Sequence, residues 1–367
     1  MNSAVEILYV ANMRLPSEKA HSVHVMEMCA ALAAAGARVT LVVPDRKTNV
    51  AVDPFEYYGV PRSFEVIRLR TLDAFRLPIP RSLAYYLHAW LFARAVGRIA
   101  VGHPHALILS RDLYAAFCLA RRGRRVAFEV HDIPSRRVRT MLRSVPTIIT
   151  TNQWKRKELI ERFGIEPHTI LVAPNAVDIK KFHASAQPSD GKKIILYAGH
   201  LFPWKGVETL ARAARFLDLE VRVVVAGGTE EDRARFQEFL KLENLPVELL
   251  PHRPHAEMPK LLASASVLVL PTSAKYPIGR EQTSPIKAFE YLAAGKPIVV
   301  ADVPSSREVF DEKTAIFFKP DDPEDCARAI RTVLALDPRE MVAAQAVLVA
   351  SRTWKNRALK ILNFLHS

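Results

Sequence analysis

Short apolar runs alternate with longer amphipathic stretches along the first half of the chain. The apolar runs are typical of buried strands, and the longer stretches have the spacing of helices. The clearest helix covers residues 21–36, with Gly36 expected at its C-cap. The expected strands of this half are residues 6–12, 38–44, 64–70, 106–111, 124–131 and 147–152. The alternation predicts a parallel sheet with helices on both faces.

The second half of the chain repeats this pattern. Its expected strands are residues 194–199, 221–228, 247–251, 267–273, 297–302 and 315–319. Its expected helices are residues 208–217, 233–243, 258–265 and 285–295. The sequence therefore predicts an α/β protein with two doubly wound, Rossmann-like domains. Ligands of such sheets bind beyond the carboxyl ends of the strands, so we expect both domains to face a cleft that holds the site.

Domain boundaries follow from composition. The stretch HASAQPSDGKK, residues 183–193, is polar and typical of a flexible linker. We therefore expect one domain at residues 1–182 and another at 194–350. Residues 351–367 are expected to form a last helix that packs back on the N-terminal domain.

One segment, RSLAYYLHAWLFARAVGRIA at residues 81–100, is apolar nearly all round. This pattern is typical of a buried helix. A membrane-facing helix is the alternative, because the segment combines aromatic residues with arginines. These residues are Arg81, Tyr85, Tyr86, Trp90, Phe92, Arg94 and Arg98.

Composition is that of a globular protein, with 367 residues, 49% hydrophobic and 25% charged. The three cysteines, Cys29, Cys118 and Cys326, are far apart and form no metal or disulfide pattern, which favours a reducing cytoplasm. The N-terminus reads as a first strand rather than as a signal peptide. No apolar run reaches the roughly 18 residues of a membrane span. We therefore expect a cytoplasmic protein.

Charge is distributed unevenly. The formal net charge is +14, and residues 1–180 carry 26 Lys and Arg against 15 Asp and Glu. A basic half favours an acidic partner, such as phospholipid, nucleic acid or a phosphorylated substrate. A solvated arginine-rich surface is the alternative.

The stretch YAGHLFPWKGVETL, residues 197–210, places Gly199 and Gly206 around Lys205 at an expected strand-to-helix turn. Glycine is common at sharp turns for structural reasons alone. Backbone N–H groups and a helix N-terminus beside a lysine would also form an anion site. Both interpretations stand on this stretch alone.

Several motifs, in order, resemble those of the retaining family-four glycosyltransferases of GT-B fold. GHLFPWKG is similar to their phosphate-binding GRLxxxKG turn, and VVVAGG to the strand that follows. REQTSPIKAFEYLAAGKPIVVAD resembles their E-x7-E segment, and WKNRALKIL the start of their last helix. FEVHD and ILVAPNAVD are similar to their histidine loop and PNGVD motif. The resemblance spans most of the chain and is weakest at residues 45–105.

The resemblance implies an N-terminal acceptor domain and a C-terminal donor domain that binds a nucleotide-sugar. In the implied site, His131, Lys205 and Gln282 are catalytic. Lys205 would stabilise charge developing on the leaving phosphate, and Glu290 would bind the ribose hydroxyls. The implied donor-binding residues are Ser22, Gly199, His200, Lys205, Gly206, Arg253, Thr283, Ser284, Pro285, Ile286 and Glu290. Arg111 and Asp112, after an expected strand, are candidates for acceptor contact.

The chain departs from the family pattern at three places. His200 replaces an arginine, so it either donates one hydrogen bond to phosphate or leaves the site with weaker charge. Gln282 replaces the first acid of E-x7-E and cannot act as a carboxylate nucleophile; Glu281 beside it could compete for the role. The family's N-terminal glycine loop is absent, and Ser22 lies in the matching place. Ser22 is either a helix N-cap or a contact of the diphosphate.

These expectations combine into a metal-independent glycosyltransferase without a cofactor. It would transfer a hexosyl unit from UDP- or GDP-sugar with retention, the donor phosphate taking the acceptor proton. The expected acceptor is a lipid-linked or cell-envelope glycan, reached by peripheral contact with an anionic membrane. The alternatives are a nucleotide-sugar epimerase of the same fold and a protein that binds nucleic acid or another acidic surface without catalysis.

Overall fold

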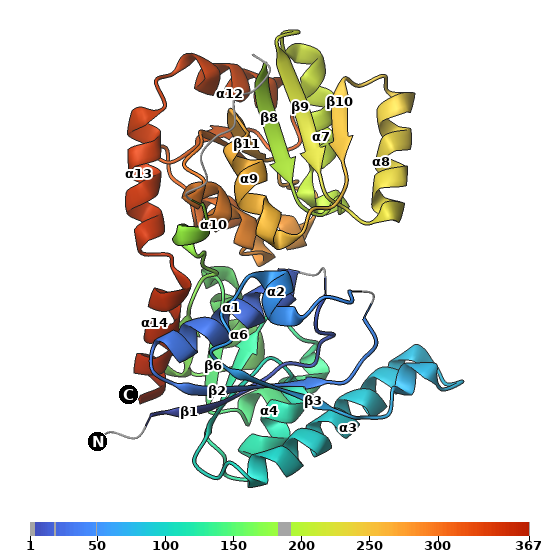
Figure 1. Ribbon diagram of the computed structural model, residues 1–367, viewed down its shortest axis with the longest axis vertical. Coiled ribbons are helices and arrows are strands. Elements are labelled where there is room, and N and C mark those ends of the chain that lie inside the picture. The colour runs from blue at the N-terminus through green and yellow to red at the C-terminus, as the bar shows by residue number, and fades with distance from the viewer. Residues whose placement is uncertain (1–3, 18–19, 49, 183–191, 367) are drawn as a thin grey trace. The chain divides into compact units, whose positions relative to one another are not determined.

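The computed structural model describes residues 4–17, 20–48, 50–182 and 192–366. The chain divides into two compact units. The first unit comprises residues 1–174 and 354–367, and the second comprises residues 175–353. Each unit is an open parallel sheet with helices packed on its faces, which confirms the predicted fold class (Figure 1).

The sheet of the first unit has seven strands in the order β3-β2-β1-β4-β5-β6-β7, and neighbouring strands are parallel. The strands are β1 Glu6–Val10, β2 Arg38–Pro44, β3 Glu65–Leu69, β4 Leu107–Ser110, β5 Val126–Val130, β6 Thr147–Thr150 and β7 Ile170–Val172. The chain builds outward from β1 to β3 and then returns to β4 on the other side of β1. Residues that follow β1 and β4 therefore lie at the position where ligands of such sheets bind.

The sheet of the second unit has six parallel strands in the order β10-β9-β8-β11-β12-β13. Its strands are β8 Lys193–Ala198, β9 Val221–Ala226, β10 Val247–Leu250, β11 Val267–Leu270, β12 Ile298–Ala301 and β13 Ile316–Phe318. All six were predicted. The change of direction falls between β8 and β11, so the turns after these strands are the expected ligand position.

The helices of the first unit are α1 Ala20–Ala34, α2 Pro54–Tyr58, α3 Arg81–Val101, α4 Leu113–Ala120, α5 Arg139–Arg143, α6 Gln153–Phe163 and α14 Trp354–His366. Those of the second unit are α7 Val207–Ala213, α8 Glu230–Leu242, α9 Met258–Ala263, α10 Ile286–Ala293, α11 Pro304–Arg307, α12 Pro323–Ala335 and α13 Arg339–Ala350. The predicted C-cap of α1 is confirmed, because Gly36 has a φ of +92° and Ala37 donates to the Leu32 carbonyl at 3.1 Å.

Two sequence expectations need correction. Strand β7 was not predicted, because a strand of only three residues is too short to show a period. The segment at 81–100 is helical as α3, but it is not buried all round. Ala84, His88, Phe92 and Val96 face the core, whereas Leu83, Tyr86 and Trp90 are exposed. Across the ranges described above, no helix has both the length and the hydropathy needed to cross a membrane.

The chain passes between the units before residue 175 and again before residue 354. Residues 175–182 thus belong to the second unit rather than the first, because Val177 and Phe182 are buried in its core with Leu196. Helix α14 belongs to the first unit, where it packs along α1 (Figure 1). Most of the predicted linker, residues 183–191, lies outside the described residues.

Candidate functional site

The turn after β8 in the second unit contains the residues that first suggested an anion site. Gly199 has a φ of +145°, and its N–H donates to the Ala226 carbonyl at 2.8 Å. A single 3-10 turn, Pro203–Lys205, leads to Gly206, whose φ is +65°, and α7 begins at Val207. Both backbone conformations favour glycine, because a Cβ would strain them.

Packing imposes a second requirement on both glycines. A Cβ at Gly206 would overlap the carbonyl oxygen of Pro271, which follows β11, and a Cβ at Gly199 would overlap Nζ of Lys287. At Gly206 two turns of the protein approach each other closely, which supports the structural interpretation of this glycine.

Two lysines lie near this turn. Lys205 ends the 3-10 turn, and Lys287 lies in the first turn of α10. Burial lowers the pKa of Lys205 to about 8. Burial also lowers the pKa of Lys287 well below its ordinary value, and the charge of Lys205 lowers it further. Within the described part of the chain neither ammonium group forms an ion pair with a carboxylate. Lys287 was not predicted as a site residue, although it lies within the segment REQTSPIKAFEYLAAGKPIVVAD that resembles the family motif.

Tyr197 holds Lys287 in place. The Nζ of Lys287 donates to the Tyr197 hydroxyl at 2.8 Å and lies 3.9 Å from the centre of its ring. The same hydroxyl donates to the backbone oxygen of His200 at 2.6 Å. The lysine, the tyrosine and the turn after β8 are therefore joined by hydrogen bonds.

His200, the residue at the family's arginine position, is neutral at pH 7. Burial lowers the pKa of its imidazole to about 4, and the charges of Lys287 and Lys205 act in the same direction. Its ring stacks on Phe202 at 5.0 Å, and Phe202 stacks on Trp204 at 4.4 Å. His200 can therefore offer a hydrogen bond to a ligand, but it brings no positive charge.

Glu290, predicted to bind ribose, lies on α10 and is only 8% exposed. Its Oε1 is 2.8 Å from Nε2 of His255, in the loop after β10. This contact orients the carboxylate, and it was not predicted from the sequence. Arg253, on the same loop, is exposed and lies 3.5 Å from Glu257.

The segment before α10 holds the remaining predicted donor residues. Gln282 ends a π-helical turn, Ile278–Gln282, and Thr283 is extended. The backbone oxygen of Ser284 accepts a hydrogen bond from the Asn175 side chain. Helix α10 begins at Ile286, so Pro285 is its N-cap rather than part of its first turn. Glu281 pairs with Arg280 at 3.0 Å.

In the first unit, Arg111 and His131 follow the neighbouring strands β4 and β5. Nη2 of Arg111 lies 3.0 Å from Nδ1 of His131. Because a guanidinium only donates, Nδ1 is the acceptor and Nε2 carries the ring proton. Desolvation and the Arg111 charge both lower the pKa of His131, so the imidazole is neutral. Its Nε2–H remains as a hydrogen-bond donor.

A buried ionic network lies beneath this pair. Glu129 of β5 is 1% exposed and is contacted by His24 at 2.8 Å, Arg357 at 2.8 Å and Tyr9 at 3.1 Å. Burial alone would raise the pKa of Glu129, but Arg357, His24 and Arg111 hold it well below its ordinary value. Arg357 comes from α14, so the network attaches the last helix to the sheet. This network was not predicted from the sequence.

Asp112 and Ser22 have structural surroundings. Asp112 caps α4 by accepting from the Ala115 N–H at 2.8 Å, and its other oxygen accepts from Asn12 at 3.0 Å. Ser22 is fully buried beside Tyr58 and lies within the first turn of α1. It is therefore not the N-cap that was one of its two predicted roles, because α1 already begins at Ala20.

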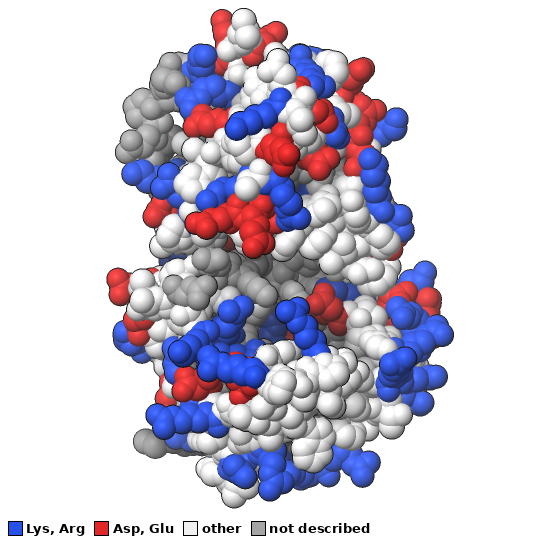
Figure 2. Space-filling view, turned by 90° about the vertical axis from the view of Figure 1, so that its right-hand side faces the viewer, with Lys and Arg blue, Asp and Glu red and all other residues white. Residues whose placement is uncertain are grey.

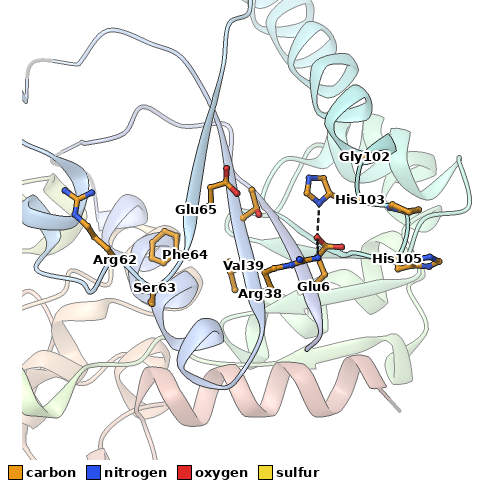
Figure 3. A pocket seen from close by; sticks show the side chains of 12 residues that line it. Glu6, Arg38, Val39, Arg62, Ser63, Phe64, Glu65, Gly102, His103 and His105 are labelled. Carbon is orange, nitrogen blue, oxygen red and sulfur yellow. Dashed lines mark hydrogen bonds and ion pairs between the residues drawn. The ribbon is translucent and has the colours of Figure 1, made fainter. Parts of the chain in front are cut away.

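A groove of about 740 Å³ lies elsewhere on the first unit (Figure 3). Glu6, Arg38 and Glu65, at the starts of β1, β2 and β3, line it together with His103. Glu6 is 2.9 Å from Nδ1 of His103 and 2.8 Å from Arg38. The groove is at the amino ends of the strands, whereas the predicted site residues follow the carboxyl ends, where ligands of such sheets bind. In the described ranges, no group of three or more His, Cys, Asp or Glu could hold a metal ion.

Two family descriptions match nearly the whole chain. Residues 21–181 match glycosyltransferase family 4, and residues 178–347 match the glycosyl transferases of group 1. The D-inositol 3-phosphate glycosyltransferase of Xylanimonas cellulosilytica is 24% identical and is matched over 93% of this chain and 90% of its own length. The enzyme of that name from Geodermatophilus obscurus is 28% identical, with 68% of this chain and 62% of its own length covered, so the chain spans less than two thirds of this relative.

Solved structures show the same fold. Sucrose-phosphate synthase from Thermosynechococcus elongatus is similar with a TM-score of 0.78 at 18% identity, covering 99% of this chain and 98% of that one. Anabaena HepE, in complex with UDP and glucose, has a TM-score of 0.70 at 20% identity, covering 99% and 100%. On the strength of the matched motifs, the two tandem parallel sheets and these similarities, the chain belongs to the family-four glycosyltransferases of GT-B fold.

Proposed function

We propose that the protein transfers a hexosyl unit from a UDP- or GDP-sugar to an acceptor, with retention of configuration. The observation that carries the proposal is the pair of lysines, Lys205 and Lys287, beside the turn after β8. They lie at the change of strand direction, where ligands of such sheets bind, and they lack carboxylate partners among the described residues. A diphosphate would supply the missing negative charge. Anabaena HepE, solved with UDP-glucose, supports a nucleotide-sugar as the donor.

The chemistry follows from this charge. When the sugar leaves, negative charge grows on the leaving phosphate, and preorganised donors stabilise it. Lys205 has this role, and the first N–H groups of α10 add to it. Glu290, oriented by His255, accepts from the ribose hydroxyls. In the first unit, His131 is proposed to donate its Nε2–H to a substrate hydroxyl. We infer a metal-independent reaction, because the lysines would neutralise the negative charge of the leaving phosphate without a metal ion.

Retention is proposed to proceed without a protein nucleophile. Gln282 carries an amide at the position of the family's first acid, and an amide can bind a hydroxyl but cannot form the covalent intermediate of a carboxylate. The acceptor oxygen would then attack from the face that the phosphate leaves, and the phosphate would take its proton.

We infer that the acceptor is lipid-linked, because α3 presents an unusual exposed face. Leu83, Tyr86 and Trp90 are 53%, 48% and 60% exposed, and the arginines Arg94 and Arg98 continue the stripe. Intervals of three and four residues place all five on one side of the helix. Figure 2 shows broad uncharged surface on the first unit, bordered by Lys and Arg. Aromatic side chains beside arginines suit the interface of an anionic membrane, where each basic residue adds about 1 kcal/mol.

Titration calorimetry with UDP and GDP, followed by product analysis with a nucleotide-sugar panel, tests the proposal. We expect one diphosphate to bind, and sugar to be transferred only when an acceptor is present. Lys205→Ala should weaken binding, while Lys241→Ala, an exposed lysine of α8, should not. Conversion of the nucleotide-sugar alone would identify an epimerase instead, and failure of both diphosphates to bind would contradict the proposal. A soluble phosphorylated polyol, such as the relatives' D-inositol 3-phosphate, is the competing acceptor in the same assay.

A further inference from the structure

The arginine of the family's GRLxxxKG turn has no charged counterpart at its own position in this chain. His200 stands there, and its imidazole is neutral at pH 7 because its pKa is about 4. A diphosphate carries charge on both phosphates, and Lys205 alone would leave most of it uncompensated. A second cation must therefore come from another element if the site is to bind a diphosphate well.

Lys287 is positioned to be that cation. The space that a Cβ would fill at Gly199 is occupied by Nζ of Lys287, so the ammonium group lies beside the residue that precedes the family's arginine position. It reaches this place from α10, whose N-terminus already points positive charge in the same direction. Any larger residue at 199 would displace it.

The contacts of Lys287 hold it without neutralising it. The Tyr197 hydroxyl accepts one of its hydrogen bonds, and the Tyr197 ring lies under the ammonium. An ammonium group has three donors, so donors remain for a ligand. Lys205 repels Lys287, Glu290 attracts it, and burial disfavours the charge of either lysine. The repulsion between like charges is unfavourable, and an anion bound beside both lysines would relieve it.

We propose that Lys287, and not His200, is the second cation that binds the diphosphate of the donor. Tyr197 positions Lys287 by a hydrogen bond, and Gly199 leaves room for its Nζ because glycine has no side chain. The inference rests on the proposed function, since it concerns the same donor site. It has a specific consequence, because Lys287 would then contact the second phosphate, which UDP has and UMP lacks.

The test measures binding of UDP and UMP, or of GDP and GMP if the guanine nucleotides bind better, to the full-length chain by calorimetry. Lys287→Met keeps the length of the side chain and removes its charge. We expect diphosphate affinity to fall about 10- to 100-fold, the loss expected for one charge-assisted hydrogen bond, and monophosphate affinity to change little. His200→Ala should weaken diphosphate binding less than Lys287→Met does. The matched control is Lys296→Met, a partly buried lysine just beyond the other end of α10, which should bind as wild type.

Proton uptake gives a second measurement that a purely structural role would not produce. Because burial lowers the pKa of Lys287, binding of an anion should raise this pKa again, and calorimetry in buffers of different ionisation enthalpy measures the proton uptake that follows. Uptake should decrease in Lys287→Met. A folded Lys287→Met variant that keeps wild-type discrimination and uptake would overturn the inference. Wild-type protein that binds neither diphosphate would instead overturn the proposed function.

Discussion

Arg357→Met tests whether the buried network of the first unit is ionised. Arg357 is 5% exposed and Glu129 is 1% exposed, and the two side chains are 2.8 Å apart. Arg357 also donates to the backbone oxygens of Ala173 and Pro174 at 3.2 and 3.0 Å. Methionine would fill most of the volume but leave the carboxylate without its main counter-charge and two carbonyls without a donor.

The expected loss is large. Breaking a buried ion pair by removing one partner destabilises a protein by about 3–5 kcal/mol. For a unit of this size, each kcal/mol shifts the melting temperature by about 2–4 °C, so a decrease of roughly 6–20 °C is expected. Calorimetric melting and urea unfolding, monitored by signals of each unit, measure it. The second unit should melt as in wild type, because Arg357 and Glu129 both belong to the first.

The pH dependence of the stability loss in Arg357→Met shows whether Glu129 is ionised in the folded protein. In the wild type the pKa of Glu129 is lower in the folded protein than in the unfolded chain. Ionised Glu129 therefore stabilises the fold at pH values above its unfolded pKa, and this stabilisation is lost as pH falls through its folded pKa. Without Arg357, burial raises the folded pKa, so the carboxylate destabilises the variant most at neutral pH and least below the unfolded value. The difference between variant and wild type should therefore shrink from pH 7 to about pH 4. A loss below about 1 kcal/mol at pH 7, or one that does not change with pH, would refute the reasoning.

Three further predictions concern the proposed donor site and membrane contact. Lys205→Ala should lower turnover about 10²-fold or more, the scale of losing one charge donor in the transition state, and unchanged turnover would remove Lys205 from the phosphate site. Glu290→Ala should weaken UDP or GDP binding in calorimetry, and His255→Ala should do so less, because it only orients the carboxylate; equal binding by all three proteins would contradict the ribose assignment. The protein should co-sediment with anionic but not neutral vesicles, less so with added salt. Trp90→Ser should reduce this binding, whereas Leu219→Ser, an exposed residue of the second unit, should not.

The sheets were predictable because their signal is local. Each strand of the second unit is a short apolar run followed by glycine, proline or a polar residue, and such runs can be recognised without knowing what they pack against. The missed strand β7 and the half-exposed helix α3 show the limit of this reasoning. Apolar residues such as Trp90 and Tyr86 look like core residues in a sequence, and only the positions of neighbouring elements decide which face is covered.

The site was predictable only where a motif is contiguous. Lys205 was found through the turn that surrounds it, whereas the contacts that orient the site join distant residues. His255 and Glu290 are 35 positions apart, and Arg357 and Glu129 are 228 apart. A single sequence contains no signal for such pairs, because neither partner is unusual in its own segment. Ser22 shows the converse error, since a serine near a helix start looks like a cap until the helix is found to begin before it.

The departures from the family motif at His200 and Gln282 have opposite electrostatic effects, because the first removes a positive charge and the second removes a negative one. The family pattern supplies an arginine and a lysine against two acids. In this chain the arginine and the first acid are replaced by the neutral groups His200 and Gln282. On the proposed assignment, Lys205 and Lys287 then stand against Glu290, and Lys287 supplies the positive charge that position 200 lacks. The substitutions that look like losses in the sequence would then change which element supplies the charge rather than remove it.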